Sequence, residues 1–311
     1  PMVARWNWLH MVYPIVFSRT MMNLRIAGIS MTELLAALQY EFMQNALFAS
    51  VLVSVMGAIT GTFIVTKRPV FLSGGISHGA FAGLGGAYYF GINPLLGAMI
   101  VAILSALAIT RVVLKQTHPA DATIGLFWAS GMAIGVLFVF ATPGYVPDLM
   151  PYLFGDILTI SDQQLLWMVV FCMVTVMLTV LLFRQLVAVS FDDEFARLRG
   201  LPVGILVAVM MVMNSVAIVM MIQSVGIILV LALLTIPPLV GLALATEIRY
   251  VMLTAFFSAL FVTTGGLLLS YFLDLPSGPV IVLVGLCLLG GVRLVKRHKR
   301  AGEKSITAKT G

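Results

Sequence analysis

Long apolar stretches follow one another along nearly the whole chain, and the short segments between them hold most of the charged residues. A helix needs about 20 apolar residues to cross the hydrocarbon core of a bilayer. Only 10% of the residues are charged, whereas soluble domains carry about 25%. The pattern therefore predicts an all-α polytopic membrane protein with about 8–9 transmembrane helices. The candidate spans are residues 44–66, 70–90, 92–114, 123–141, 163–183, 203–222, 225–246, 250–271 and 278–295.

Basic residues assign the ends of these spans to sides of the membrane, because Lys and Arg are enriched in cytoplasmic loops. The loops 142–162 and 271–277 contain neither residue and should face away from the cytoplasm. The C-terminus is predicted to be cytoplasmic. The residues that indicate the cytoplasmic face are Lys67, Arg68, Arg111, Lys115, Arg184, Arg197, Arg199, Arg249, Lys296, Arg297, Lys299 and Arg300.

The spans divide the chain into three parts. Residues 1–43 hold aromatic side chains among polar positions and are interpreted as an interfacial amphipathic segment. Residues 44–296 form the transmembrane domain, and residues 297–311 form a basic cytoplasmic tail. Two alternatives remain open: an additional span near the N-terminus, or eight spans and a re-entrant segment, because the second span is short and rich in glycine.

His78 is the one ionisable residue well inside a candidate span, among 18 Lys and Arg, 12 Asp and Glu and 4 His residues. A titratable group in hydrocarbon is costly, so it usually faces a bundle interior or a water-filled path. On a helix His78 shares a face with Gly74, Ala82 and Gly85, which should leave room for an ion or water. We interpret His78 as part of a metal-ion path. A packing histidine, hydrogen-bonded to a neighbouring helix, is the alternative.

Small residues and prolines suggest how the spans pack. Gly75, Gly79 and Gly83 recur four residues apart and predict close helix contact. Pro237 and Pro238 are expected to interrupt the seventh span, because proline removes helical hydrogen bonds and frees backbone carbonyls. A plain kink and a site that supplies carbonyl ligands are equally compatible with this pair.

The sequence lacks the usual features of a self-powered transporter. No Lys follows a Gly, so there is no Walker A loop. All twelve Asp and Glu residues lie in loops or at span ends, which disfavours a proton-coupled secondary metal transporter. A permease driven by a separate ATPase subunit is the simplest remaining reading. A secondary carrier and a non-transporting membrane scaffold or insertase are the alternatives.

A short helix is predicted between the fifth and sixth spans, in residues 190–202. Asp192 or Asp193 suits its N-cap, Gly200 its C-cap, and Pro202 stops it. A helix of this kind on the cytoplasmic face suits docking into a groove on a partner. An ordinary amphipathic loop helix is the alternative. The candidate coupling residues are Asp193, Glu194, Phe195, Arg197, Leu198 and Gly200.

Taken together, these segments resemble the membrane permeases of bacterial zinc, manganese and iron ATP-binding-cassette (ABC) importers. The resemblance extends from about Glu41 to Arg293 and implies the metal-type ABC importer permease fold. Single segments are weakly diagnostic, but six in the same order are specific. They are residues 71–83 around Ser77 and His78, 122–133, 152–161, 191–203, 233–246 and 275–284.

The resemblance implies a set of partners. The permease would be a homodimer in the bacterial plasma (inner) membrane, surrounded by lipid. It would bind two copies of a cytoplasmic ABC ATPase and receive metal from an extracytoplasmic metal-binding protein. No nucleic acid, permanently bound cofactor or catalytic residue is expected in this chain. The transported ion would be zinc or manganese, with iron as a third alternative.

The resemblance also assigns roles to residues. It places His78 near the translocation path and residues 191–202 in the coupling helix. Many family members carry Asp four residues before this histidine, where the present chain has Gly74. Asp156, in a Phe-Gly-Asp motif, is a candidate substitute ligand, and a helix cap or turn residue is its alternative role.

Overall fold

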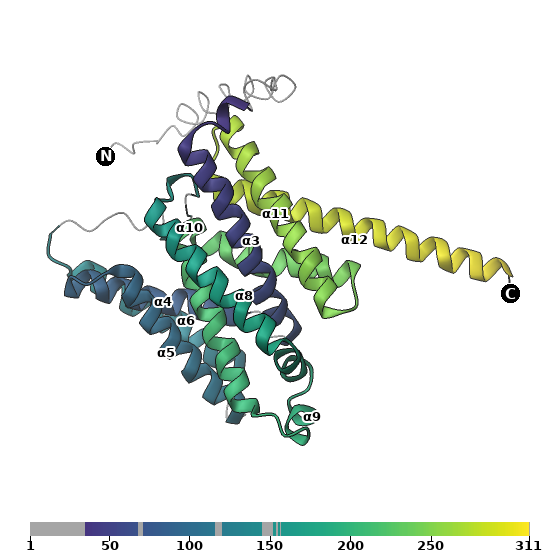
Figure 1. Ribbon diagram of the computed structural model, residues 1–311, viewed down its shortest axis with the longest axis horizontal. Coiled ribbons are helices and arrows are strands. Elements are labelled where there is room, and N and C mark those ends of the chain that lie inside the picture. Colours follow the sequence, from purple (N-terminus) through teal and green to yellow (C-terminus); the bar gives the residue numbers. More distant parts are fainter. Residues whose placement is uncertain are drawn as a thin grey trace, which may run out of the picture.

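The computed structural model describes residues 35–67, 71–115, 120–144, 152–153, 155 and 157–310, and within these ranges the chain forms helices joined by short turns and loops, without strands. Seven of the described helices are long and apolar enough to cross a membrane, namely every long helix except α4. The prediction of an all-α polytopic membrane protein is confirmed (Figure 1). The elements are α3 (Glu41–Lys67), α4 (Phe71–Phe90), α5 (Pro94–Lys115), α6 (Ala120–Ala141), the 3₁₀ turn η1 (Ile157–Thr159), α8 (Asp162–Phe191), α9 (Asp193–Leu198), α10 (Val203–Leu244), α11 (Ile248–Leu273) and α12 (Ser277–Thr310).

Helices α3 and α8 run in the same direction. At one end Asn45 Nδ2 donates a 2.8 Å hydrogen bond to Asp162 Oδ1. At the other end Lys67 Nζ donates to the carbonyl oxygen of Val189 over 3.2 Å. The end that carries Lys67 also carries α9, and it is the end predicted to face the cytoplasm.

Helix α10 consists of two arms that meet at Gly226, where the backbone leaves the helical conformation (φ 75°, ψ 163°). The first arm runs opposite to α8, because Ser190 Oγ lies 3.6 Å from Met210 Sδ and Ser224 Oγ lies 2.8 Å from Met168 Sδ. The second arm runs in the opposite direction to the first, as its contacts with α3 show, so the chain reverses its direction at Gly226. The two arms correspond to the predicted spans 203–222 and 225–246.

The second arm runs parallel to α3. A methyl group placed on Gly57 would lie 3.6 Å from the carbonyl oxygen of Leu233, and one on Gly61 would lie 2.8 Å from Pro238 Cγ. The later residue of α3 is close to the later residue of α10, so both helices run toward the charged end. Helix α3 also lies against the first arm of α10, because Met221 Cε would be 3.4 Å from the same methyl group on Gly57.

The expected interruption at Pro237 and Pro238 is wrong. The helix continues through both prolines to Leu244, and its one non-helical residue is Gly226, close to the predicted boundary between the spans 203–222 and 225–246. Proline has a φ that fits a helix, so it can remain inside one when the freed carbonyls are accommodated. A φ near +75° is readily adopted only by glycine, which explains why the chain reverses there.

Helices α4, α5 and α6 form a group on one side of the molecule (Figure 1). The glycines of α4 allow this packing, as predicted. A methyl group on Gly75 would lie 2.5 Å from Ile124 Cγ2 of α6, and one on Gly83 would lie 2.1 Å from the carbonyl oxygen of Gly97 in α5. The glycines do not break α4, which is continuous from Phe71 to Phe90.

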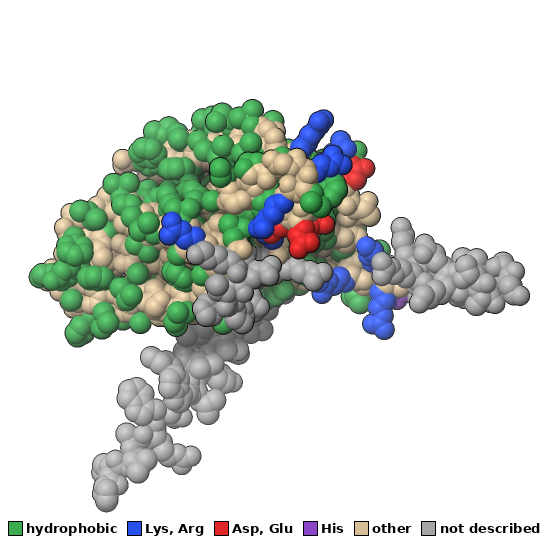
Figure 2. Space-filling model, turned by 90° about the horizontal axis from the view of Figure 1, so that it is seen from below, with side chains coloured by type: hydrophobic (Ala, Val, Ile, Leu, Met, Phe, Trp, Pro, Cys, Tyr) green, Lys and Arg blue, Asp and Glu red, His purple; other side chains and the backbone are tan. Residues whose placement is uncertain are grey.

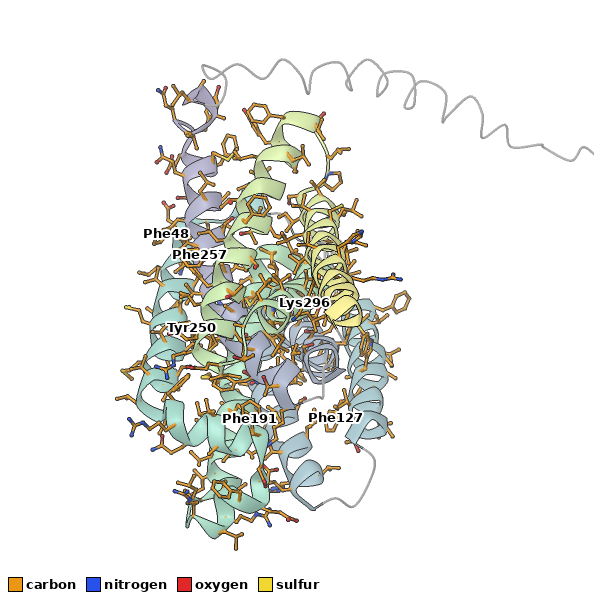
Figure 3. The ribbon with its side chains drawn as sticks, turned by 90° about the vertical axis from the view of Figure 1, so that its right-hand side faces the viewer. Phe48, Phe127, Phe191, Tyr250, Phe257 and Lys296 are labelled. Atoms are coloured by element: carbon orange, nitrogen blue, oxygen red, sulfur yellow. The ribbon has the colours of Figure 1, made fainter. Side chains whose placement is uncertain are left out.

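Hydrophobic side chains cover much of the outer surface, as expected for a protein surrounded by lipid. Figure 3 labels two of them, Phe48 and Phe257, which are 48% and 59% exposed. Viewed from below, Lys, Arg, Asp and Glu side chains gather over only part of the visible face (Figure 2). Helix α12 continues to Thr310, past the expected domain boundary at residue 296.

Candidate functional site

His78 lies in the middle of α4, where its ring stacks on the indole of Trp128 from α6. The ring centroids are 4.4 Å apart and the planes differ by 14°. Among the described residues His78 Nδ1 is enclosed and has no hydrogen-bond partner. The side chain as a whole is half-buried. The packing alternative required a hydrogen bond to a neighbouring helix, and the described residues supply none at Nδ1.

Backbone contacts fix the position of His78 against α6. A methyl group on Gly131 would lie 2.7 Å from the carbonyl oxygen of His78 and 2.5 Å from Gly79 Cα. The hydroxyl of the preceding Ser77 donates to the carbonyl oxygen of Ser73 over 2.6 Å, so it is satisfied within its own helix. The imidazole is therefore the polar group of this motif that remains available for a ligand.

Trp128 fills the space beside His78 that the glycines were expected to leave open. A methyl group on Gly74 would lie 2.3 Å from Trp128 Cζ3, and one on Gly85 would lie 2.3 Å from the carbonyl oxygen of Gly135. The expected room for an ion on this face is thus taken by the indole and the α6 backbone. Sequence reasoning missed Trp128. A signal was present in the sequence: Gly74 has no side chain, and in a close-packed interior a large side chain from another helix must fill that space.

The described residues contain no group of three or more His, Cys, Asp and Glu side chains that could hold a metal ion. An ion at His78 would therefore have one imidazole from this chain, together with water or backbone oxygens. Such a set of ligands suits passage of a cation, because a site that must release its ion has to bind weakly.

Asp156 lies outside the described residues, so its predicted role stays a prediction. Its neighbour Gly155 has a φ of +70°, and a methyl group there would lie 2.0 Å from the carbonyl carbon of Val225. The Tyr152 ring lies 5.6 Å from the Phe81 ring of α4. This segment therefore contacts both α4 and the reversal of α10.

The two prolines of α10 free carbonyls that point at α3. Residues 237 and 238 lack N–H groups, so the carbonyls of Leu233 and Leu234, four residues earlier, lose their helical partners. These oxygens lie 3.6 and 2.6 Å from the positions of methyl groups placed on Gly57 and Gly61. The glycines permit this close approach. In this structure the freed carbonyls face a packed helix, as a structural role requires.

Helix α9 is defined by its caps, close to the prediction. Asp192 is the N-cap, and its Oδ1 accepts hydrogen bonds of 3.0 and 2.9 Å from the N–H groups of Glu194 and Phe195. Arg199 is the C-cap, and Gly200 follows at φ +77°. The Gly200 N–H donates to the carbonyl oxygen of Arg197 over 2.9 Å. A left-handed glycine at this position ends helices very commonly.

The side chains of α9 separate into an inner and an outer face. Ala196 is fully buried. Leu198 is 87% exposed, Phe195 is 48% exposed, and Arg199 lies over the Phe195 ring at 4.9 Å. The candidate coupling residues Glu194 and Arg197 are exposed as well. The structure thus brings these side chains together on a small apolar and charged surface at the end of the bundle.

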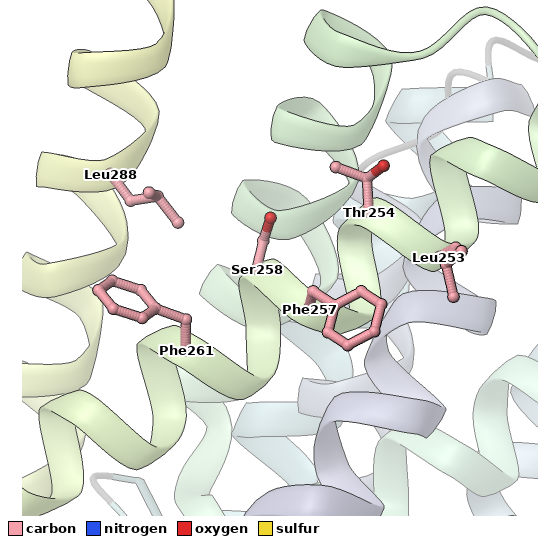
Figure 4. A pocket seen from close by; sticks show the side chains of 6 residues that line it. All are labelled: Leu253, Thr254, Phe257, Ser258, Phe261 and Leu288. Atoms are coloured by element: carbon pink, nitrogen blue, oxygen red, sulfur yellow. The ribbon is translucent and has the colours of Figure 1, made fainter.

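Two surface hollows lie between α11 and α12, apart from His78. One, of about 330 Å³, is lined by Leu253, Thr254, Phe257, Ser258, Phe261 and Leu288 (Figure 4). Its Thr254 hydroxyl donates to the carbonyl oxygen of Tyr250. The other, of about 450 Å³, is lined by hydrophobic residues and Cys287. Neither lining resembles a path for a cation, because apolar walls cannot replace the water that surrounds an ion.

The described helices form an apolar, membrane-crossing bundle, with the short helix α9 exposed at one end. The sequence matches the ABC 3 transport family over residues 39–293. The chain belongs to this family of metal ABC transporter permeases.

Similar proteins agree with this assignment. The chain is 42% identical, over 83% of its length and 92% of the relative, to an uncharacterized membrane protein of Synechocystis. It is 32% identical, over 81% of its length and 90% of the relative, to the manganese import system permease protein ScaB of Streptococcus parasanguinis. It also resembles PsaBC from Streptococcus pneumoniae in complex with Fab, with a TM-score of 0.76, 25% identity and coverage of 85% and 95%.

Proposed function

We propose that this chain is the membrane permease of an ABC importer for divalent transition metal ions, driven by a separate cytoplasmic ATPase. The geometry of α9 carries the proposal. A capped six-residue helix turns an apolar edge away from the bundle at the charged end of the molecule. Such a surface suits the groove of a soluble partner.

The partners follow from this role. Two permease copies would form a homodimer and bind two ATPase subunits on the α9 side. An extracytoplasmic metal-binding protein would deliver the ion to the opposite end, where α8 begins and α11 ends. The permease itself would hydrolyse nothing. It would lie in the plasma (inner) membrane, with its C-terminus in the cytoplasm.

The cargo would be zinc or manganese. His78 offers an imidazole nitrogen, which suits zinc and is usable by manganese or iron. The relatives named for manganese support manganese as a cargo. Growth of a deletion strain, complemented with this chain and starved in turn of zinc, manganese or iron, identifies the ion. Rescue under none of the three conditions would contradict a role in metal import.

Substitutions in α9 test ATPase docking. Leu198→Asp should abolish co-purification of the ATPase, because it places a charge in a desolvated groove, while membrane insertion stays normal. Leu198→Met is the matched control, since it keeps an apolar side chain of similar volume, and it should retain the ATPase. Full ATPase binding and uptake by the Leu198→Asp variant would reject α9 as the docking helix.

A further inference from the structure

An ion pair joins α9 to the end of α3. Lys67 Nζ lies 2.9 Å from Asp193 Oδ1, and the Lys67 side chain is only 11% exposed. The same ammonium donates to the carbonyl oxygen of Val189 at the end of α8. The other ion pair among the described residues, Arg249 with Glu247, is local and largely exposed. Of the two ion pairs in the described ranges, the one between Lys67 and Asp193 joins segments that are far apart in the sequence.

The pair lies on the inner side of α9, away from the proposed docking edge. Asp193 is 37% exposed at its side chain, whereas Leu198 is 87% exposed and points outward. Ala196 is buried beside the bundle. A partner seated on the outer edge would leave the contact between Lys67 and Asp193 in place, and movement of α9 would be passed to Lys67.

Helix α3 leads from Lys67 into the core of the molecule. In the apolar stretch of α3 that can cross a membrane, 72% of the residues are buried inside the structure. A methyl group on Gly57 would lie 3.4 Å from Met221 Cε in the first arm of α10 and 3.6 Å from the carbonyl oxygen of Leu233 in the second, and one on Gly61 would lie 2.8 Å from Pro238 Cγ, so α3 packs closely on both arms. Because the two arms meet at Gly226, a shift of α3 acts on both sides of the reversal. Gly155, from the loop beside α4, packs against this same reversal.

We propose that Lys67 is a positioning residue that couples α9 to the transmembrane core, so that ATP-driven movement of α9 reaches the reversal of α10 through α3. This inference rests on the proposed function. The ammonium suits the role because it joins three helices at one point: its own α3, the α8 carbonyl and the α9 carboxylate. Exposed ion pairs contribute little, but a mostly buried lysine keeps its partner, because separation would leave an uncompensated charge.

The test reconstitutes the permease with its ATPase in proteoliposomes, adds the extracytoplasmic metal-binding protein, and supplies Zn²⁺ and Mn²⁺ separately. Lys67→Met should retain the bound ATPase and its ATP hydrolysis, because Lys67 lies away from the docking edge. Metal transported per ATP hydrolysed should fall at least about fivefold, the lower end of typical coupling between sites. Lys67→Arg, which keeps the charge and several donors, should restore most of the ratio.

The double variant Lys67→Met, Asp193→Asn separates coupling from stability. It leaves no unpaired charge, so its melting temperature should recover relative to the Lys67→Met variant, while transport per ATP stays low. Recovery of transport together with stability would overturn the inference and leave a purely structural pair. An unchanged ratio in the Lys67→Met variant with ATPase bound would overturn it alone. If the wild-type permease binds no ATPase, the proposed function fails and the inference fails with it.

Discussion

His78 can be replaced in ways that separate coordination from packing. His78→Phe keeps an aromatic ring against Trp128 but removes the nitrogen ligand. We expect it to be expressed and to bind the ATPase normally while metal uptake falls severely. His78→Leu should fail in the same way. Uptake assays with zinc and manganese measure the effect.

The control for this prediction is His78→Gln, which keeps hydrogen-bonding groups and loses the imidazole. Restored transport in that variant would favour a polar packing role. Unaltered transport in the His78→Leu variant would contradict any place for His78 in the ion path.

Gly74 should not tolerate a side chain while Trp128 is present. A Cβ at Gly74 would lie 2.3 Å from Trp128 Cζ3, and overpacking of this kind costs typically about 1–3 kcal/mol. That exceeds the gain of up to about 1 kcal/mol that alanine offers a helix. We therefore expect Gly74→Ala to lower the thermal stability of the purified protein in detergent.

Gly125→Ala on α6 is the matched control, because nothing lies within 4 Å of its Cβ position. It should leave stability equal or slightly higher. In a Trp128→Ala background, Gly74→Ala should cost less stability than it does in the wild-type protein, because the indole that it would clash with is gone. An equal cost in both backgrounds would mean that Trp128 is not the group that excludes a side chain at position 74.

At the scale of elements, α10 depends on Gly226 for its reversal. Its backbone, at φ 75° and ψ 163°, lies in a region that is essentially restricted to glycine. Gly226→Ala should therefore destabilise the protein by about 1–3 kcal/mol. Thermal unfolding in detergent measures the change. Gly265→Ala in α11 is the control and should be nearly neutral, because nothing lies within 4 Å of the Cβ position of Gly265. Equal stability of the two variants would contradict a strained reversal.

The elements also show which parts of the site could be predicted. The caps of α9 were predictable, because Asp192 and Gly200 act through hydrogen bonds to neighbours a few residues away. The reversal of α10 lies close to the predicted boundary between the spans 203–222 and 225–246, but the additional interruption expected at the prolines is wrong. A proline in a sequence suggests a broken helix, because it removes one helical hydrogen bond. Whether the helix breaks depends on what surrounds the carbonyl that loses its partner. Here α3 presents Gly57 and Gly61 at that place.

At the scale of the whole molecule, the charge pattern predicts one orientation in the membrane. Ile92 follows α4 at the end remote from α9 and is 53% exposed, whereas Leu198 on α9 is 87% exposed. In a background with Cys287→Ala, Ile92→Cys should react with an impermeant thiol reagent in intact cells. Leu198→Cys should react only after the membrane is opened. The reverse labelling pattern would overturn the assignment of the sides.

The sequence by itself determined the membrane class, the approximate positions of the spans and the short helix α9. Hydropathy and capping are properties of neighbouring residues, so a single chain displays them. Only the tertiary structure placed Trp128 against Gly74 and His78, seated the loop at Gly155 on the α10 reversal, and joined Lys67 to Asp193. Each of these contacts links residues on different helices, because the packing of whole helix faces brings them together, and no local pattern specifies their partners.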